Sequence, residues 1–488
     1  MQVNSRRKSS LLSRFNNSVG FIEAFIWGTF LLSLVVALYP QESDRILSLQ
    51  PYISVSGLAQ VMWPYATLLT GIILNFSKRY MAGNHRLGYF FLRCFMFLVS
   101  VMVLSATDHI LVFLLAWLSM GWFMAGLIGH KIDWPQARAA GRLALQYFLA
   151  GTMYLCVGIL VLYEETGTFL ISSILENISE LSLAQYYLVF ACFCMGALIQ
   201  SSLFPVQDWL MSSMTAPTPA SALMHAGFVN AGGILLTKFS TIFVQYTTPM
   251  LILAGIGALS AIMGIVWKMV QTAVKRQLGC STIAQMGFMI LQCGLGFFSA
   301  AITHLILHGF YKGYLFLNSG NAIGQTAPSS TKTSQSSLTR NLVSLTTGLI
   351  GGGVFALLTG KGLKFNSGLF LAFIVVLTLL HSSREIVNQI NVSRLLRHAV
   401  FPLVALGGTA IYGLIFNGIT TLLSELPNVV SPSPLSWVHL VIALCFSATW
   451  LMIETEAYKK FDRLYVYILN ASQPHPATIL SSKEEYHV

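Results

Sequence analysis

The chain has 488 residues, of which 55% are hydrophobic and only 9% are charged. A soluble globular domain exposes more polar surface than this, so the composition excludes a soluble fold and predicts a polytopic membrane protein. The 28 Lys and Arg residues outnumber the 17 Asp and Glu residues, but they are scattered over short loops and tails. No basic stripe forms, so no nucleic-acid partner is expected, and membrane lipids are the expected surroundings.

The chain begins with a basic segment, residues 1–21, that contains Arg6, Arg7, Lys8 and Arg14. No small-residue cleavage motif follows the first apolar run, so this segment is not expected to be a secretory signal peptide. Because cytoplasmic ends of membrane proteins are rich in Lys and Arg, the sequence predicts a cytoplasmic N-terminus.

Apolar runs of about 18–22 residues recur along the chain, and such a run is long enough to cross a bilayer as a helix. They predict an all-α, polytopic membrane protein with about 13 to 14 transmembrane helices, counting one broken helix near 205–240. The other runs cover residues 22–39, 52–74, 89–105, 108–130, 143–163, 183–204, 249–270, 278–298, 301–317, 342–359, 367–381, 400–423 and 435–453.

Polar segments divide this series of runs. A Ser/Thr-rich loop at 326–340 is predicted to separate a transmembrane core, 22–325, from a second transmembrane bundle, 341–455. The chain ends in a polar tail, 456–488, and its final part from Ala471 is expected to be exposed or bound to a partner rather than packed.

The stretch 200–239 departs from the pattern of an ordinary span. Pro205, Pro217 and Pro219 each remove a backbone donor and obstruct the helix that precedes them. A broken backbone is tolerated at membrane depth only where it is buried in protein or lines a watery cavity. We therefore predict a discontinuous helix, broken at Pro217 and Pro219, that lines an ion pathway.

Ionisable residues inside apolar segments are costly and mark functional sites by default. The broken stretch carries Asp208, His225 and Lys238. His225 titrates near neutrality and is a candidate to gate a proton, but a structural histidine hydrogen-bonded beside the unwound prolines fits equally well. Asp208 is a candidate for the pathway, although Asp208 and Asp108 could equally cap helix starts at the membrane interface.

Three titratable residues, His304, His308 and Lys312, follow one another at intervals of four in the run HLILHGFYK. On a helix this spacing places them on one face. Three such groups are expensive to bury dry, which favours a hydrated proton relay. A structural polar network is the alternative.

A second basic group precedes this run. Lys268, Gln271 and Lys275 share one helix face, and Arg276 follows. Lys268 is expected to lie deeper, where desolvation would let it load and release protons. Lys275 and Arg276 are either part of the pathway or a loop pair that obeys the positive-inside rule.

The chain carries no recognisable catalytic motif. Its seven cysteines all fall in apolar segments and none has ligand spacing with a histidine, so we expect neither a zinc site nor a disulfide framework. A nucleotide-binding loop, a serine elbow and a haem or iron–sulfur motif are also missing from the sequence. We therefore expect a transporter subunit rather than an enzyme, with no cofactor in this chain.

The broken stretch closely resembles a known signature. The residues FPVQDWLMSSMTAPTPASALMHAGFVNAGGILL are similar to those of the proton-conducting membrane transporter family. This family contains the antiporter-like membrane subunits of respiratory complex I, Mrp sodium/proton antiporters and membrane-bound hydrogenases. The resemblance covers roughly residues 60–325 and implies an antiporter-like core of inverted repeats with discontinuous helices around a hydrophilic axis.

The resemblance also implies roles for residues. His225 matches the family's histidine after the broken helix, and His304, His308 and Lys312 match its relay helix. Lys275 and Arg276 match the basic pair before that helix.

Three positions depart from the family pattern. Leu118 stands where a glutamate is usual, Gln200 where a lysine is usual, and Ala273 where an acid precedes the basic pair. The Glu–Lys pair of the usual half-channel is therefore lacking, which puts the complex I mechanism in doubt for this chain.

These departures and the ending RLYVYILNASQPHPAT resemble DabB, the family of membrane subunits of inorganic-carbon pumps. That resemblance implies an ion-conducting subunit of an energy-coupled CO2/bicarbonate pump in the inner membrane of a bacterial cell. It also implies a partner, a large zinc subunit of the DabA type that resembles a β-carbonic anhydrase. The coupling ion, proton or sodium, stays open.

Two other functions fit the same residues. One is a proton-pumping or antiporter subunit of a respiratory or Mrp-type complex, against which Leu118, Gln200 and Ala273 argue. The other is a membrane anchor that no longer conducts, against which the retained histidines argue.

Overall fold

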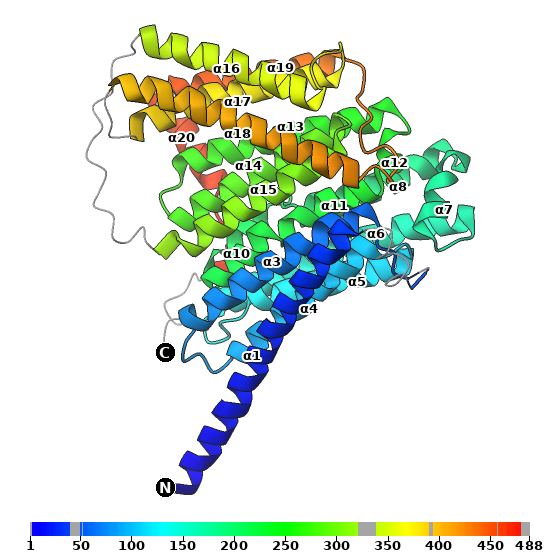
Figure 1. Ribbon diagram of the computed structural model, residues 1–488, viewed down its shortest axis with the longest axis vertical. Helices are drawn as coiled ribbons and strands as arrows, with labels where there is room; N and C mark the ends of the chain where they lie inside the picture. Colours follow the sequence, from blue (N-terminus) through cyan, green and yellow to red (C-terminus); the bar gives the residue numbers. More distant parts are fainter. Residues whose placement is uncertain are drawn as a thin grey trace.

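The computed structural model describes residues 2–39, 49–50, 52–320, 338–389, 394–455 and 457–479. These residues fold into helices, with isolated bridges but no extended strand among them (Figure 1). The longer helices are α1 Gln2–Leu38, α3 Gly57–Tyr80, α4 Leu87–Ala106, α5 Ile110–Ile128, α6 Pro135–Thr166, α8 Leu183–Gln200, α13 Thr247–Val270, α14 Val274–Gly294, α15 Phe298–Leu317, α16 Leu338–Thr359, α17 Ser367–Gln389, α18 Arg394–Leu422 and α19 Trp437–Glu454.

Eleven helices in this described part of the chain are long and apolar enough to cross a membrane. Helices α14 and α15 lie in the same bundle and have similar lengths, but polar side chains interrupt their apolar surface. Helix α17 has a shorter apolar stretch, residues 367–380. The predicted all-α, multi-pass membrane fold is confirmed.

Two apolar clusters hold the bundle together. The larger one runs through the helices from α3 to α15 and also includes residues of α1 and α18. The second joins α13 and α14 to helices α16–α19, which we call the C-terminal bundle, through residues such as Phe355, Phe370 and Phe416 (Figure 1). The second cluster therefore fixes the C-terminal bundle against the flank of α13 and α14.

Helices α13 and α14 pack with their backbones almost in contact. A Cβ atom added at Gly264 would lie 2.4 Å from the Ala284 nitrogen, and one added at Gly287 would lie 2.4 Å from the Ala261 nitrogen. Small residues allow such close approach between membrane helices, where the hydrophobic effect contributes little. These glycines therefore determine how closely the two helices pack.

The stretch 200–239 is interrupted more than once. Helix α8 ends at Gln200, residues 201–207 are not helical, and α9 follows at Asp208–Ser212. Helix α10, Thr218–Ala226, is separated from α11, Ala231–Lys238, by a short 3-10 turn.

The two predicted break residues lie at a helix start. Pro217 is the N-cap of α10, and Pro219 lies within its first turn, where a missing N–H costs nothing. They thus begin α10 after the unwound residue Ala216, while the interruptions on either side lie at 201–207 and 227–230.

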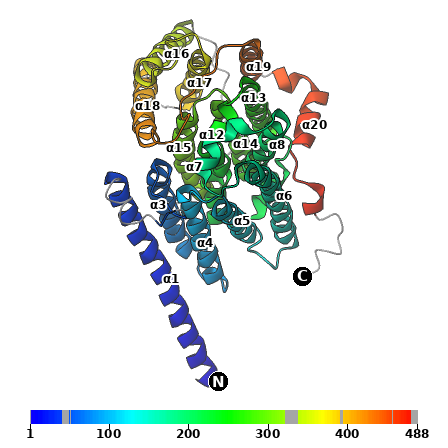
Figure 2. The ribbon, with the colours of Figure 1, turned by 90° about the vertical axis from the view of Figure 1, so that its right-hand side faces the viewer.

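The described part of the polar tail lies against the bundle, although the sequence favoured an exposed or partner-bound segment from Ala471. Helix α20, Asp462–Ala471, lies on the flank of the bundle beside α13 (Figure 2), and Ser472 and Thr478 are buried. Ser212 of α9 accepts hydrogen bonds from the His475 backbone N–H (3.1 Å) and lies 3.1 Å from the Thr478 hydroxyl. Residues 480–488 and most of the predicted loop 326–340 lie outside the described residues.

Candidate ion pathway

His225 lies wholly buried on α10 and is held on two sides. Its Nδ1 is 3.0 Å from the Thr282 hydroxyl of α14, and its ring stacks on Phe316 of α15 at 4.2 Å between centroids. Its Nε2 has no hydrogen-bond partner among the described residues. The histidine is therefore fixed by α14 rather than by the prolines, and one ring nitrogen stays open to a proton or a water molecule.

Lys312 reaches the same turn of α14. Its Nζ donates to the Leu278 carbonyl at 3.1 Å, and the Thr282 hydroxyl donates to that carbonyl at 2.9 Å. Because Thr282 also contacts His225, one carbonyl and one hydroxyl connect the two titratable side chains. The sequence separates His225 and Lys312, and α14 joins them.

His304, His308 and Lys312 share one face of α15, and we call them the α15 stripe. The two imidazole rings lie nearly parallel, with centroids 5.7 Å apart. Each has a buried Nε2 without a partner in the described structure. Buried polar atoms normally have partners, so these nitrogens mark places where water or a transferred proton is needed.

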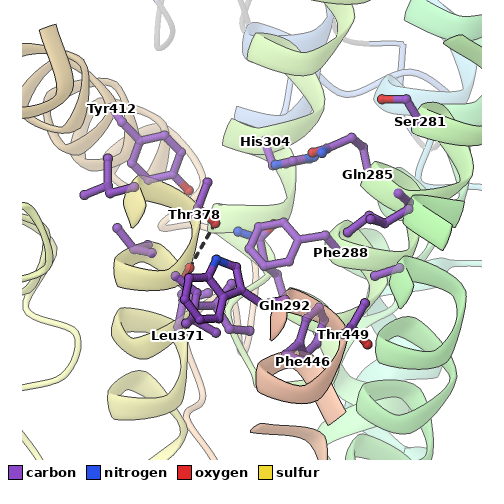
Figure 3. Close-up of a pocket in the computed structure, with 18 of the residues that line it drawn as sticks. Ser281, Gln285, Phe288, Gln292, His304, Leu371, Thr378, Tyr412, Phe446 and Thr449 are labelled. Atoms are coloured by element: carbon purple, nitrogen blue, oxygen red, sulfur yellow. Dashed lines mark hydrogen bonds between the residues drawn. The ribbon is translucent and has the colours of Figure 1, made fainter. Parts of the chain in front are cut away.

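The stripe ends at a cavity of about 620 Å³ between α13, α14 and the C-terminal bundle (Figure 3). His304, Gln285 and Gln292 form a polar wall, and residues such as Leu371 and Phe446 form an apolar one. The cavity is large enough for several water molecules and has polar groups to bind them. It therefore places His304, one end of the α15 stripe, beside a space that can hold water.

The basic residues that precede α15, Lys268, Lys275 and Arg276, lie in different surroundings. Lys268 lines the same cavity but is exposed, so it is not the deeper, desolvated lysine that its position in the sequence predicts. Lys275 donates to the Ala216 carbonyl at 3.0 Å, the unwound residue just before Pro217. Arg276 donates to the Gln473 side chain at 3.0 Å. Lys275 thus stabilises the break, and Arg276 holds the tail.

The remaining predicted residues make contacts elsewhere. Lys238 is buried on α11, with its Nζ 3.4 Å from the Ser105 carbonyl. Asp108 accepts hydrogen bonds from the backbone N–H and hydroxyl of Ser172 in the first turn of α7, Ile171–Glu176, and not from the start of α5. Asp208 begins α9 at the bundle end, where burial raises its pKa and the nearby His475 opposes that rise.

Lys361 is a titratable residue that our sequence reasoning missed. It lies between α16 and α17, only 4% exposed, with its Nζ 3.5 Å from the Phe416 ring centroid and 4.5 Å from that of Phe297. Gly360 and Gly362 flank it with φ values of +67° and +86°. Burial lowers the pKa of Lys361 well below its usual value. In the sequence it stands between two glycines in a short segment between apolar runs, which gave no signal of burial.

The positions that depart from the family pattern hold no charge. Gln200 is buried, and its Nε2 has no partner among the described residues. Leu118 is half-buried on α5. Within the described residues, no three His, Cys, Asp or Glu side chains are grouped as metal ligands would be.

Comparison with known proteins gives a family and several relatives. The family described as "NADH:quinone oxidoreductase/Mrp antiporter, TM" matches residues 106–387. The chain is 34% identical over 276 residues to the probable inorganic carbon transporter subunit DabB1 of Halothiobacillus neapolitanus, a match that covers 55% of this chain and 49% of that relative. It thus spans about half the length of that relative.

A second relative is matched over most of its length. The chain is 31% identical over 440 residues to the probable inorganic carbon transporter subunit DabB of Bacillus subtilis, covering 88% of this chain and 84% of that protein. Among solved structures, the Mrp complex from Dietzia sp. DQ12-45-1b has a similar fold. The TM-score is 0.55 at 22% identity, covering 94% of this chain and 52% of that chain.

Proposed function

The chain belongs to the NADH:quinone oxidoreductase/Mrp antiporter membrane family, in its DabB branch, and from this membership we propose that it conducts ions for an inorganic-carbon pump. In this proposal proton or sodium flow through the chain drives a partner subunit that handles CO2 and bicarbonate. The partner is a large zinc protein of the DabA type, and this chain carries no cofactor of its own. The complex lies in the inner membrane of a bacterial cell.

The observation that carries the proposal is a line of buried titratable groups. It begins at His225 beside the break, reaches Lys312 through Thr282 and the Leu278 carbonyl, and continues along α15 to His304 in the cavity wall. In a purely structural network each buried polar atom would have a hydrogen-bond partner. The Nε2 atoms of His225, His304 and His308 have none among the described residues. Open nitrogens suit proton relay, in which a site accepts on one side and donates on the other.

The missing Glu–Lys pair affects how proton movement can be coupled to the partner. With Leu118 and Gln200 in place of a Glu–Lys pair, the chain has no fixed ion pair there to pull a proton onward. Proton movement along the α15 stripe therefore has to be coupled to a change of conformation. That change biases the partner's zinc site toward CO2 hydration, so bicarbonate accumulates.

The test is uptake of labelled inorganic carbon by a host without carbonic anhydrase that expresses this chain together with its partner. We expect a protonophore and His308→Ala each to lower uptake at least tenfold. Tyr311→Phe is the matched control, because Tyr311 lies on the same helix but is 59% exposed. Uptake that ignores the protonophore, or survives His308→Ala at a normal level of membrane protein, would refute the proposal.

A second candidate function is a subunit of a respiratory or Mrp-type antiporter complex, which the description of the matched family favours. It predicts co-purification with quinone- or NADH-linked subunits, whereas the first proposal predicts co-purification with the zinc partner. A proton-flux assay on the purified chain in vesicles separates both from an anchor that does not conduct.

A further inference from the structure

We propose that Arg86, Arg93, His130 and Lys131 form a binding site for one oxyanion at the membrane surface. The four side chains come from the turn before α4, from α4 itself and from the turn that joins α5 to α6. None of them belongs to the ion pathway, so this site is independent of the proposed transport function.

The first argument is the state of His130. The residue is 2% exposed, and neither Nδ1 nor Nε2 has a hydrogen-bond partner within the described structure. Its ring packs edge to face with the Phe90 ring, at 5.4 Å between centroids. An imidazole buried with both nitrogens unused is costly, unless a ligand completes it.

The second argument is uncompensated positive charge. Arg93 is fixed in place, because its Nη1 donates to the Gly126 carbonyl at 2.5 Å and its guanidinium packs against Gly126. The Arg86 Nη1 is buried and has no hydrogen-bond partner in the part of the chain that the structure describes. Among the described residues no carboxylate forms an ion pair with Arg86, Arg93 or Lys131, and Asp133 on the same turn is exposed. Arg86 and Arg93 are half-buried and Lys131 is exposed, and a bound anion would supply the counter-charge that the protein does not place beside them.

The titration of His130 agrees with this arrangement. Burial, followed by the charges of Arg93, Arg86 and Lys131, lowers the pKa of His130 to about 4. The ring is therefore neutral near pH 7 and offers one N–H donor without adding to the positive charge.

The ligand class follows from the donors. Guanidinium groups bind planar or tetrahedral oxyanions through paired N–H bonds, as in carboxylate and phosphate recognition. Tyr89 and Trp134 lie beside the cluster, with Arg86 5.6 Å from the Tyr89 ring and Lys131 5.9 Å from the Trp134 ring. Tyr and Trp mark the level of lipid headgroups. The oxyanion is thus either a phospholipid phosphate or a free anion such as phosphate or bicarbonate.

Thermal unfolding of the purified, delipidated full chain tests the site in two arms. The first arm adds sodium phosphate or bicarbonate against sodium chloride at equal ionic strength. The second arm adds phosphatidylglycerol against phosphatidylcholine in mixed micelles. We expect the Tm to rise by about 2 °C or more in at least one arm. A rise in the first arm identifies a free oxyanion, and a rise in the second arm alone identifies a lipid headgroup.

Variants decide whether these residues form the site. Arg86→Gln should remove the rise, while Arg138→Gln should leave it intact, since Arg138 is an exposed arginine on neighbouring α6. In case Arg86→Gln does not accumulate, Arg86→Lys keeps the charge but loses the paired donors and should weaken apparent anion affinity about tenfold. No rise in either arm, or a rise that Arg138→Gln removes equally, would overturn the proposal.

Discussion

Two buried lysines show how the core and the C-terminal bundle differ. Lys312 in the core and Lys361 at the start of the C-terminal bundle are almost equally hidden, at 1% and 4% exposure. Lys312 donates to a backbone carbonyl and is connected to His225, whereas Lys361 faces two aromatic rings and has no hydrogen-bond partner in the described residues. Similar burial thus accompanies quite different chemistry.

The surroundings explain the difference. Nearly all residues of the span 218–238 are buried within the protein, but few residues of the span 437–454 are. A core surrounded by protein can supply polar partners along a route, while a bundle facing lipid has few to offer. We infer that the core carries ions and that the C-terminal bundle closes the cavity beside it.

The largest effect is expected from Lys312→Met. This change removes the ammonium but keeps most of the side-chain volume, so we expect proton flux into vesicles to fall at least tenfold. Lys361→Met is the matched control and should keep most of the flux. If the two variants lose flux equally, the inference that ions pass through the core and not through the C-terminal bundle is wrong.

Glycine substitutions compare the packing of the two regions. Gly264→Ala places a Cβ 2.4 Å from the backbone of α14, so we expect the unfolding free energy to fall by about 1–3 kcal/mol. Gly353→Ala on α16 meets nothing within 4 Å and should be neutral or stabilise by up to about 1 kcal/mol. Thermal unfolding in detergent measures both, and equal destabilisation would contradict the close α13–α14 contact.

Lys361→Met is also expected to stabilise the protein, by about 1 kcal/mol at pH 7. Burial lowers the pKa of Lys361, so between that value and the unfolded value near 10 the unfolded chain binds one more proton. Wild-type stability therefore rises with pH across this window, and the advantage of methionine shrinks toward pH 10. An advantage independent of pH would mean that the Phe297 and Phe416 rings keep the ammonium charged.

The smallest effect is expected from Ser212→Ala. It removes the hydroxyl that holds His475 and Thr478, so we expect a loss of about 1 kcal/mol together with faster proteolysis of the tail. Ser213→Ala is a suitable control, since the Ser213 hydroxyl bonds only the local Leu210 carbonyl. A tail that stays equally protected in both variants would show that the hydrogen bonds to Ser212 do not hold it.

The fold followed from the sequence because apolar runs, prolines and helical spacing are local signals. His304, His308 and Lys312 lie on one face because their spacing requires it. How deeply a side chain is buried is not a local signal. Spacing could not tell that Lys268 lies at an exposed cavity wall, since exposure depends on which helices stand opposite.

Contacts between distant segments were also hidden from the sequence. The tail was expected to be exposed because it is polar and contains prolines, but its partner Ser212 lies more than 250 residues earlier. Thr282 connects His225 to Lys312 from a third helix, and nothing in its immediate neighbours indicates that position. Lys361 stood beside Lys364 in a short segment between two apolar runs, where a pair of lysines is typical of a loop, so nothing indicated that one of them is buried.

The close contact between α13 and α14 has a mechanical consequence. Their backbones lie so close at Gly264 and Gly287 that sliding one helix along the other would press Cβ atoms of other residues against the facing main chain. The pair is a rigid post, and Lys275 and Arg276 at the foot of α14 attach the break and the tail to it. In the proposed function, the joint 227–230 between α10 and α11, where the helix is already interrupted, is the place beside this post at which the chain can bend.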